Sequence, residues 1–151
     1  MADLIYPAGL QRLLQHHYDA AFDLEVNLRA AIISTAYTPN KAELDLTTLN
    51  ANRWNGTAGA GDPIVGGFLA VVDGSDVKLR SNSISFGTVT VLGTAAFADP
   101  AYVVVYAEKL AAAADADRYP LILFEAGWTP VLSQGFNFVV QPDSIATITT
   151  L

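Results

Sequence analysis

The chain contains no cysteine, so neither a disulfide framework nor a thiolate metal site is possible. Histidine is almost as scarce, since His16 and His17 are the only two. Because adjacent residues of a helix point about 100° apart, these neighbours cannot chelate one metal ion together. No stretch approaches the ~20 consecutive apolar residues of a membrane-spanning helix. The opening residues carry neither a basic region nor a long apolar run, so we expect no signal peptide and no membrane partner.

Charged residues are also few, at 15% of the chain against about 25% in ordinary soluble domains, while 52% of the residues are hydrophobic. Two explanations are open. The surface of a soluble β-protein can be built from Thr, Ser, Asn and Ala, or the flanks of a subunit can be covered by copies of itself or by another protein.

The balance of charge is acidic. Fifteen acidic residues against eight basic ones give a net charge of −7, and the basic residues are scattered from Arg12 to Arg118. A nucleic-acid surface needs clustered Lys and Arg, so no nucleic-acid partner is expected.

Short runs rich in β-branched and aromatic residues dominate the chain, each bounded by Pro, Gly, Asp or Ser, and this pattern predicts strands. We predict eight strands, at residues 25–33, 64–72, 77–80, 83–92, 101–107, 119–125, 135–141 and 144–151. The run at 101–107 is apolar on both faces, so we expect it to be a central strand covered on both sides. The helical spacing of Leu10, Leu13, Leu14 and Tyr18 predicts a helix over residues 7–22.

A chain of 151 residues is expected to form a single domain. The predicted fold is mostly β: a jelly-roll-like antiparallel β-sandwich of about eight strands over residues 24–151, with residues 1–23 as an N-terminal helical segment. Gly66 and Gly67, inside a predicted strand, indicate a bulge or a close backbone approach. Residues 73–76 predict a hairpin turn. A short helical segment is predicted between residue 38 or 40 and Leu49.

No catalytic constellation is recognisable. No Gly-x-Ser-x-Gly elbow presents a serine, and no Lys-Ser/Thr follows the glycines of residues 56–61 to make a phosphate loop. The acidic turns at 73–76 and 115–117 lack the downstream bidentate acid of a calcium loop. Paired carboxylates for glycoside hydrolysis would come from Glu25, Glu43, Glu108 and Glu125, and nothing singles out two of them. We therefore expect a protein that is not an enzyme and that holds no cofactor or metal ion.

The two tryptophans, Trp54 and Trp128, lie in predicted loops. An exposed tryptophan can be a platform that stacks on sugars or an anchor in a protein interface. It can also close the core like a lid. The sequence leaves these readings open.

The order of these features resembles a group of small structural proteins of tailed bacteriophages. The matching segments are residues 4–10 (LIYPAGL), 26–40 (VNLRAAIISTAYTPN), 102–107 (YVVVYA), 119–125 (YPLILFE) and 135–148 (GFNFVVQPDSIATI). Together with the Ala/Asp-rich loop before residue 119, they extend over nearly the whole chain.

The resemblance implies a virion protein of the decoration or cement type, which sits on the outer capsid surface and bridges neighbouring shell subunits. It implies the major capsid protein as partner and assembly in the cytoplasm of a bacterial host. Because capsids offer three-fold positions, we expect a homotrimer. The interface residues expected from the helix and the tryptophan loops are Leu4, Tyr6, Leu10, Leu14, Tyr18, Trp54 and Trp128. The alternative is a tail-associated or fibre module that recognises host glycans through the two tryptophans.

Overall fold

The computed structural model of the chain describes residues 4–15, 24–54, 61–67, 69–90, 100–109, 112, 114–125, 135–140 and 146–149; for 24–27, 87–90, 135–140 and 146–149 it describes the backbone alone. The elements in chain order are β1 (Leu4–Ile5), α1 (Pro7–Gln15), β2 (Leu24–Ser34), α2 (Thr47–Ala51), β3 (Ile64–Val65), β4 (Leu69–Asp73), β5 (Asp76–Arg80), β6 (Ile84–Thr90), β7 (Pro100–Lys109), the 3-10 helix η2 (Asp115–Asp117), β8 (Arg118–Glu125), β9 (Gly135–Val140) and β10 (Ala146–Thr149).

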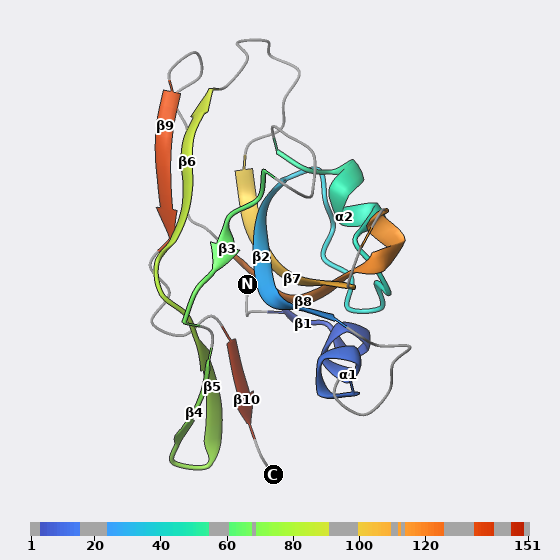
Figure 1. Cartoon of the computed structure of the whole chain (residues 1–151), viewed down its shortest axis with the longest axis vertical. Coiled ribbons are helices and arrows are strands. Elements are labelled where there is room, and N and C mark those ends of the chain that lie inside the picture. The colour runs from blue at the N-terminus through green and yellow to red at the C-terminus, as the bar shows by residue number, and fades with distance from the viewer. Residues whose placement is uncertain are drawn as a thin grey trace.

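Strands dominate this structure, and every described strand pair is antiparallel, which confirms the predicted fold class with its N-terminal helix. The strands form a five-stranded sheet in the order β1-β8-β7-β2-β3, a three-stranded sheet in the order β10-β5-β4, and the pair β6-β9. One face of the five-stranded sheet is covered by strands of the other two sheets, and the opposite face is covered by the α2 region (Figure 1).

The core lies on both faces of β7, where residues 103–108 are all buried, as the apolar pattern of this run predicts. On one face, Val103 and Val105 pack with Leu79 of β5 and Ile84 of β6. On the other face, a second cluster joins the sheet to α2 and the preceding loop: Tyr6, Ala31, Ile33, Tyr37, Leu46, Leu49, Val104, Tyr106 and Leu123. Alternation along each strand therefore fills two separate apolar layers with one sheet.

Short segments cover the edges of the five-stranded sheet. Beside β8, β1 pairs Leu4 with Leu123, and the backbone N–H of Tyr6 donates to the carbonyl oxygen of Leu121 at 2.9 Å. Beside β2, the backbone N–H of Trp54 donates to the carbonyl oxygen of Ile32 at 3.0 Å, next to the short strand β3. The long strands β8 and β2 therefore have partners along these stretches, and the outermost strands β1 and β3 are only two residues long, too short to pair extensively with another chain.

Helix α1 begins at Pro7, as predicted, because proline at a first helical position forfeits only an N–H that has no partner in the helix. Its described part ends at Gln15, and the predicted continuation over residues 16–22 lies outside the described residues. Gly9 is buried against β8, where an added Cβ would lie 1.9 Å from the carbonyl oxygen of Pro120. The glycine thus permits close contact between α1 and the sheet.

The strand predicted over residues 64–72 is two strands, β3 and β4, separated at Gly66 and Gly67. Gly67 has φ 62°, and a Cβ there would lie 2.6 Å from the side-chain oxygen of Asn82. The predicted close approach is confirmed, and it redirects the chain from the central sheet into the β4–β5 hairpin. This hairpin and β10 extend away from the central sheet (Figure 1).

Candidate functional site

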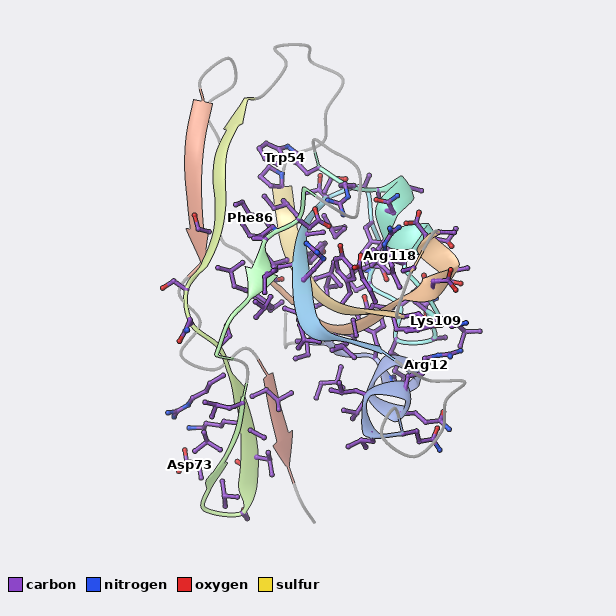
Figure 2. All side chains as sticks on the ribbon, viewed as in Figure 1. Arg12, Trp54, Asp73, Phe86, Lys109 and Arg118 are labelled. Atoms are coloured by element: carbon purple, nitrogen blue, oxygen red, sulfur yellow. The ribbon has the colours of Figure 1, made fainter. Side chains whose placement is uncertain are left out.

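Eight polar residues form one network at the end of the central sheet, where β2, β7 and β8 meet α2 and η2; Figure 2 labels Arg118 in this region. The members of this ionic network are Arg29, Asn50, Arg53, Asp62, Tyr106, Glu108, Asp115 and Arg118. Three are cationic and three are anionic, so their charges cancel.

Strand register brings four of these residues together. Arg29 of β2 lies opposite Tyr106 of β7, and Glu108 of β7 lies opposite Arg118 of β8. Since Tyr106 and Glu108 are two positions apart on one strand, all four side chains share one face of the sheet.

Glu108 joins the two strands on either side of β7. One of its carboxylate oxygens accepts from Nε of Arg29 at 3.2 Å, and the other accepts from Nε of Arg118 at 3.0 Å. Arg118 also donates to Asp115 of η2 at 2.9 Å. Glu108 is only 7% exposed, which a carboxylate tolerates because it is paired.

Asp62 receives more donors than any other member. Arg53 binds both of its carboxylate oxygens, each at 2.6 Å, and the hydroxyl of Tyr106 donates to one of them at 2.6 Å. Arg29 donates to the backbone carbonyl oxygen of Asp62 at 2.9 Å. This two-pronged arginine–carboxylate geometry is the strongest form of such a pair.

Asn50 of α2 closes the network into a ring. Its side-chain nitrogen donates to Asp115 at 2.8 Å, and its side-chain oxygen accepts from Nε of Arg53 at 2.8 Å. All six carboxylate oxygens of Asp62, Glu108 and Asp115 therefore accept a hydrogen bond from another member of the ring.

Burial and pairing shift the pKa values of Tyr106 and Arg118. Burial raises the pKa of the Tyr106 hydroxyl, and its bond to Asp62 raises it further, so the phenol remains a donor. Burial alone would lower the pKa of Arg118, but its bonds to Glu108 and Asp115 outweigh burial and the pKa is raised. The arrangement clamps α2, η2 and the segment around Asp62 to the sheet, and it leaves no ring carboxylate oxygen unpaired to act as a base.

A second buried polar pair lies in the layer under α2. The hydroxyls of Tyr6 and Tyr37 are 3.1 Å apart, and the ring of Tyr37 meets that of Tyr102 edge-on with centroids 6.4 Å apart. Burial raises the pKa of Tyr6, and its bond to Tyr37 raises it further. The pair fixes the N-terminal segment in the core.

Two of the expected interface residues are core residues instead. Tyr6 is fully buried, because the chain between β1 and α1 passes over the sheet, and Trp54 is 3% exposed, because its backbone is bonded to the edge of β2. Neither side chain can contact a partner in this conformation, which corrects the prediction. The reading of Trp54 as a lid on the core is the one that its burial supports.

The remaining expected interface residues differ in exposure. Leu14 is 65% exposed, whereas Leu4 and Leu10 are half-buried. Tyr18 and Trp128 lie outside the described residues. With Trp54 buried, one of the two tryptophans that motivated the glycan-binding alternative cannot stack on a sugar.

Sequence reasoning missed the ionic network. Glu108 was one of four glutamates considered for hydrolysis, but both of its oxygens are held by arginines. The available signal was a glutamate two residues after a buried tyrosine on a strand that is otherwise apolar on both faces, which indicates a paired charge. Its two partners lie 79 positions before it (Arg29) and 10 positions after it (Arg118), so spacing in the sequence does not reveal them.

Within the described ranges, no group of three or more His, Cys, Asp or Glu residues is placed to hold a metal ion. His16 and His17 lie outside those ranges. The described helices include none that is long and apolar enough to cross a membrane. No protein-family model, curated protein or solved structure matches the chain.

Proposed function

We propose that this protein is a bacteriophage virion component of the decoration or cement type, which lies on the outer capsid surface and bridges neighbouring subunits of the shell. Its partners are the major capsid protein and further copies of itself, gathered as a homotrimer at three-fold positions. Its contribution is physical: burial of apolar surface between subunits, which adds cohesion against the outward pressure of packaged DNA.

The observation that carries this proposal is an exterior depleted of charge. Only 15% of residues are charged, and the ionic network pairs three of the eight cationic side chains with three of the fifteen acidic ones, leaving none of the six more than 26% exposed. Asp62, Glu108 and Arg53 in that network are each less than a tenth exposed. The surface is therefore less ionised than the composition alone indicates.

Large apolar side chains occupy part of that exterior. Leu14 at the end of α1 and Leu44 before α2 are each about two-thirds exposed, and Ile64, Leu69 and Val72 form a further exposed group along β3 and β4. Scattered exposed leucines are common in monomers. Combined with the low charge, they support an exterior that other subunits cover.

An electron-microscopy map of virions from the phage that encodes the chain tests the proposal. We expect density of this fold on the outside of the shell, at positions shared by adjacent subunits. Density at the tail or its fibres, or none on the particle, contradicts the proposal.

A binding assay tests the part played by α1. Removing residues 1–20 is unsuitable, because it deletes β1 and the core residue Tyr6 together with the helix. Leu14→Gln keeps the fold and removes one exposed apolar side chain, so we expect weaker co-sedimentation with undecorated shells. Ser83→Gln, at an exposed polar position, is the matched control. Equal binding by both variants would show that this end of α1 is not a contact.

A further inference from the structure

The β4 strand is an edge of the three-stranded sheet, and within the described part of the chain no strand pairs with its outer side. It lies on the part of the molecule that extends from the central sheet (Figure 1). An edge of this kind presents unpaired N–H and C=O groups to any strand that fits. The edge strands of the five-stranded sheet, β1 and β3, are in contrast only two residues long.

The register of the hairpin separates its side chains by chemistry. One face carries Ala70 and Val72 of β4 opposite Leu79 and Val77 of β5, and it has no charge on these two strands. The other face carries Leu69, Val71 and Asp73 opposite Arg80, Lys78 and Asp76. The uncharged face continues from the core, since Leu79 is buried, to Val72, which is 77% exposed.

The backbone groups at the open edge follow from the turn. Asp73 and Asp76 flank a two-residue turn in which Gly74 has φ 64°, so they form the closing hydrogen-bonded pair. Hydrogen-bonded pairs alternate along an antiparallel ladder. The N–H and C=O groups of Val71 and Leu69 therefore point to β5, and those of Ala70 and Val72 point outward.

Charge is distributed unevenly along this edge. Asp73 and Asp76 lie at the turn, whereas Arg80 lies at the far end, opposite Leu69. The Nε atom of Arg80 has no hydrogen-bond partner among the described residues. Asp73 pairs with Lys78 of the same hairpin, and its side chain is still 55% exposed.

We propose that β4 pairs in antiparallel fashion with β4 of a second copy of this chain, about a two-fold axis through Val71. In this register Ala70 of each copy lies opposite Val72 of the other, and their outward groups form four backbone hydrogen bonds. Asp73 of the second copy then lies opposite Leu69, two strands from Arg80 on the same face and about 9.6 Å away between Cα atoms. The long side chain of Arg80 can span this separation to reach Asp73 of the second copy.

Charge complementarity selects a second copy as the occupant. A two-fold axis places the acidic end of one hairpin beside the basic end of the other, and it also joins the two uncharged faces on one side of a six-stranded sheet. Such an isologous contact closes on itself and forms no fibre. Each copy carries a net charge of −7, so copies associate most readily through a region where opposite charges pair.

The proposed contact between the two β4 strands is small, so we expect it to be weak. A pairing of five residues along one edge buries far less than the roughly 1,600 Å² of a standard interface. We expect weak association in dilute solution and substantial pairing at millimolar concentration or where copies are held close together on a surface. The pairing belongs to the chain itself and is tested on purified protein, so its failure leaves the proposed function untouched.

Because the chain has no cysteine, a single introduced cysteine reports the register. In Val71→Cys the two thiols face each other in a non-hydrogen-bonded pair with Cα atoms about 4.5 Å apart, which suits a disulfide. In the control Val72→Cys the two Cα atoms are about 8 Å apart, beyond disulfide reach. With oxidised glutathione as oxidant, we expect covalent dimers to form about tenfold faster in Val71→Cys.

A proline tests whether the backbone edge carries the contact. Val72→Pro, combined with Val71→Cys, removes an outward N–H and no bond within the hairpin, so the sheet persists and cross-linking falls to the rate of Val72→Cys. Circular dichroism and the unfolding midpoint verify the fold of each variant. Equal cross-linking of the two cysteine variants, or no effect of the proline, overturns the proposal. A third outcome would also overturn the proposal. If the thiol of Val71→Cys never cross-links and becomes inaccessible to thiol reagents only when the protein is bound to capsid shells, a segment of the shell, not a second copy, occupies the β4 edge.

Discussion

At the scale of single residues, Asp62 is the most heavily bonded charge described in the molecule. It accepts from both arms of Arg53 and from Tyr106, and its backbone carbonyl accepts from Arg29. A buried pair of this kind adds little net stability compared with apolar residues of the same size, but removing one partner leaves the other charge buried and unpaired. The ionic network therefore holds the segment around Asp62 in one arrangement on the five-stranded sheet.

Asp62→Ala is expected to lower the free energy of unfolding by about 3–5 kcal/mol, because Arg53 would remain buried without its carboxylate. Asp73→Ala removes an exposed ion pair with Lys78 and is the matched control, for which we expect little change. Urea unfolding followed by circular dichroism measures both. A similar loss in the two variants would mean that burial of the network has no energetic consequence.

Alkaline pH is expected to destabilise the fold through the buried tyrosines. The pKa values of Tyr6 and Tyr106 are raised in the folded state, mainly by burial, whereas those of the unfolded chain lie near ~10. The stability they contribute is complete below that pH and declines above it, because the unfolded chain releases the protons first. The slope is at most about 1.4 kcal/mol per pH unit for each group.

Urea unfolding of the wild type and of Tyr6→Phe at several pH values between neutrality and 11 measures this slope. The phenylalanine variant has lost one of the titrating hydroxyls, so its stability should fall less steeply above pH ~10. Identical slopes would show that Tyr6 is deprotonated equally in both states.

At the scale of elements, the contact between α1 and β8 depends on a missing side chain. Gly9 faces the backbone of Pro120 directly, so the helix approaches the sheet more closely than any other residue would allow. This approach positions Leu13 against the core and the guanidinium of Arg12 4.1 Å from the ring centroid of Tyr119. A cation over an aromatic face adds a modest attraction at such a site.

Gly9→Ala is expected to destabilise the protein by about 1–3 kcal/mol, because the added methyl group overlaps backbone that cannot rotate away. Alanine's better helix propensity, about 1 kcal/mol, offsets only part of this loss. Gly61→Ala meets nothing within 4 Å and is the control. Thermal unfolding of both variants measures the difference. A Gly9→Ala variant more stable than the wild type would mean that α1 can move away from β8 with no loss of stability.

At the scale of the whole molecule, burial is concentrated around β7 and thins out toward the β4–β5 hairpin. Val103, Val104, Val105 and Tyr106 have no exposed surface, whereas Val72 is 77% exposed. Regions with few buried contacts open more readily than the core of the same domain. The β4–β5 hairpin, the part proposed to pair with another copy, is therefore less firmly anchored than the strands around β7.

Amide hydrogen exchange followed by NMR is expected to show this gradient. Amides of residues 103–107 should exchange only through global unfolding, whereas those of Ala70 and Val72 should exchange rapidly in dilute solution, because they point to the open edge. Raising the protein concentration should slow the exchange of Ala70 and Val72 alone. Equal exchange rates for the amides of residues 103–107 and for those of Ala70 and Val72 would contradict this prediction.

How much could be foreseen varied from element to element. The start of α1 at Pro7, the apolar central strand and the turn at residues 73–76 were all predictable, because each depends on residues adjacent in the chain. The division of one predicted strand into β3 and β4 was signalled by Gly66 and Gly67 but not fixed by them, since it also depends on Asn82. The interface residues Tyr6 and Trp54 were misplaced, because an aromatic side chain looks the same in sequence whether it is covered or exposed.

The amino-acid sequence by itself determined that the protein is built from antiparallel strands with one helix at its start, and that its surface is poor in charge. Only the tertiary structure decided which charges are paired and which edge remains open. Arg29, Asp62 and Glu108 meet because β2, β7 and the segment before β3 become neighbours. The outer edge of β4 has no partner strand among the described residues, because the chain turns away from the central sheet at Gly67. Periodicity along a strand is local, whereas the identity of a strand's neighbour is not.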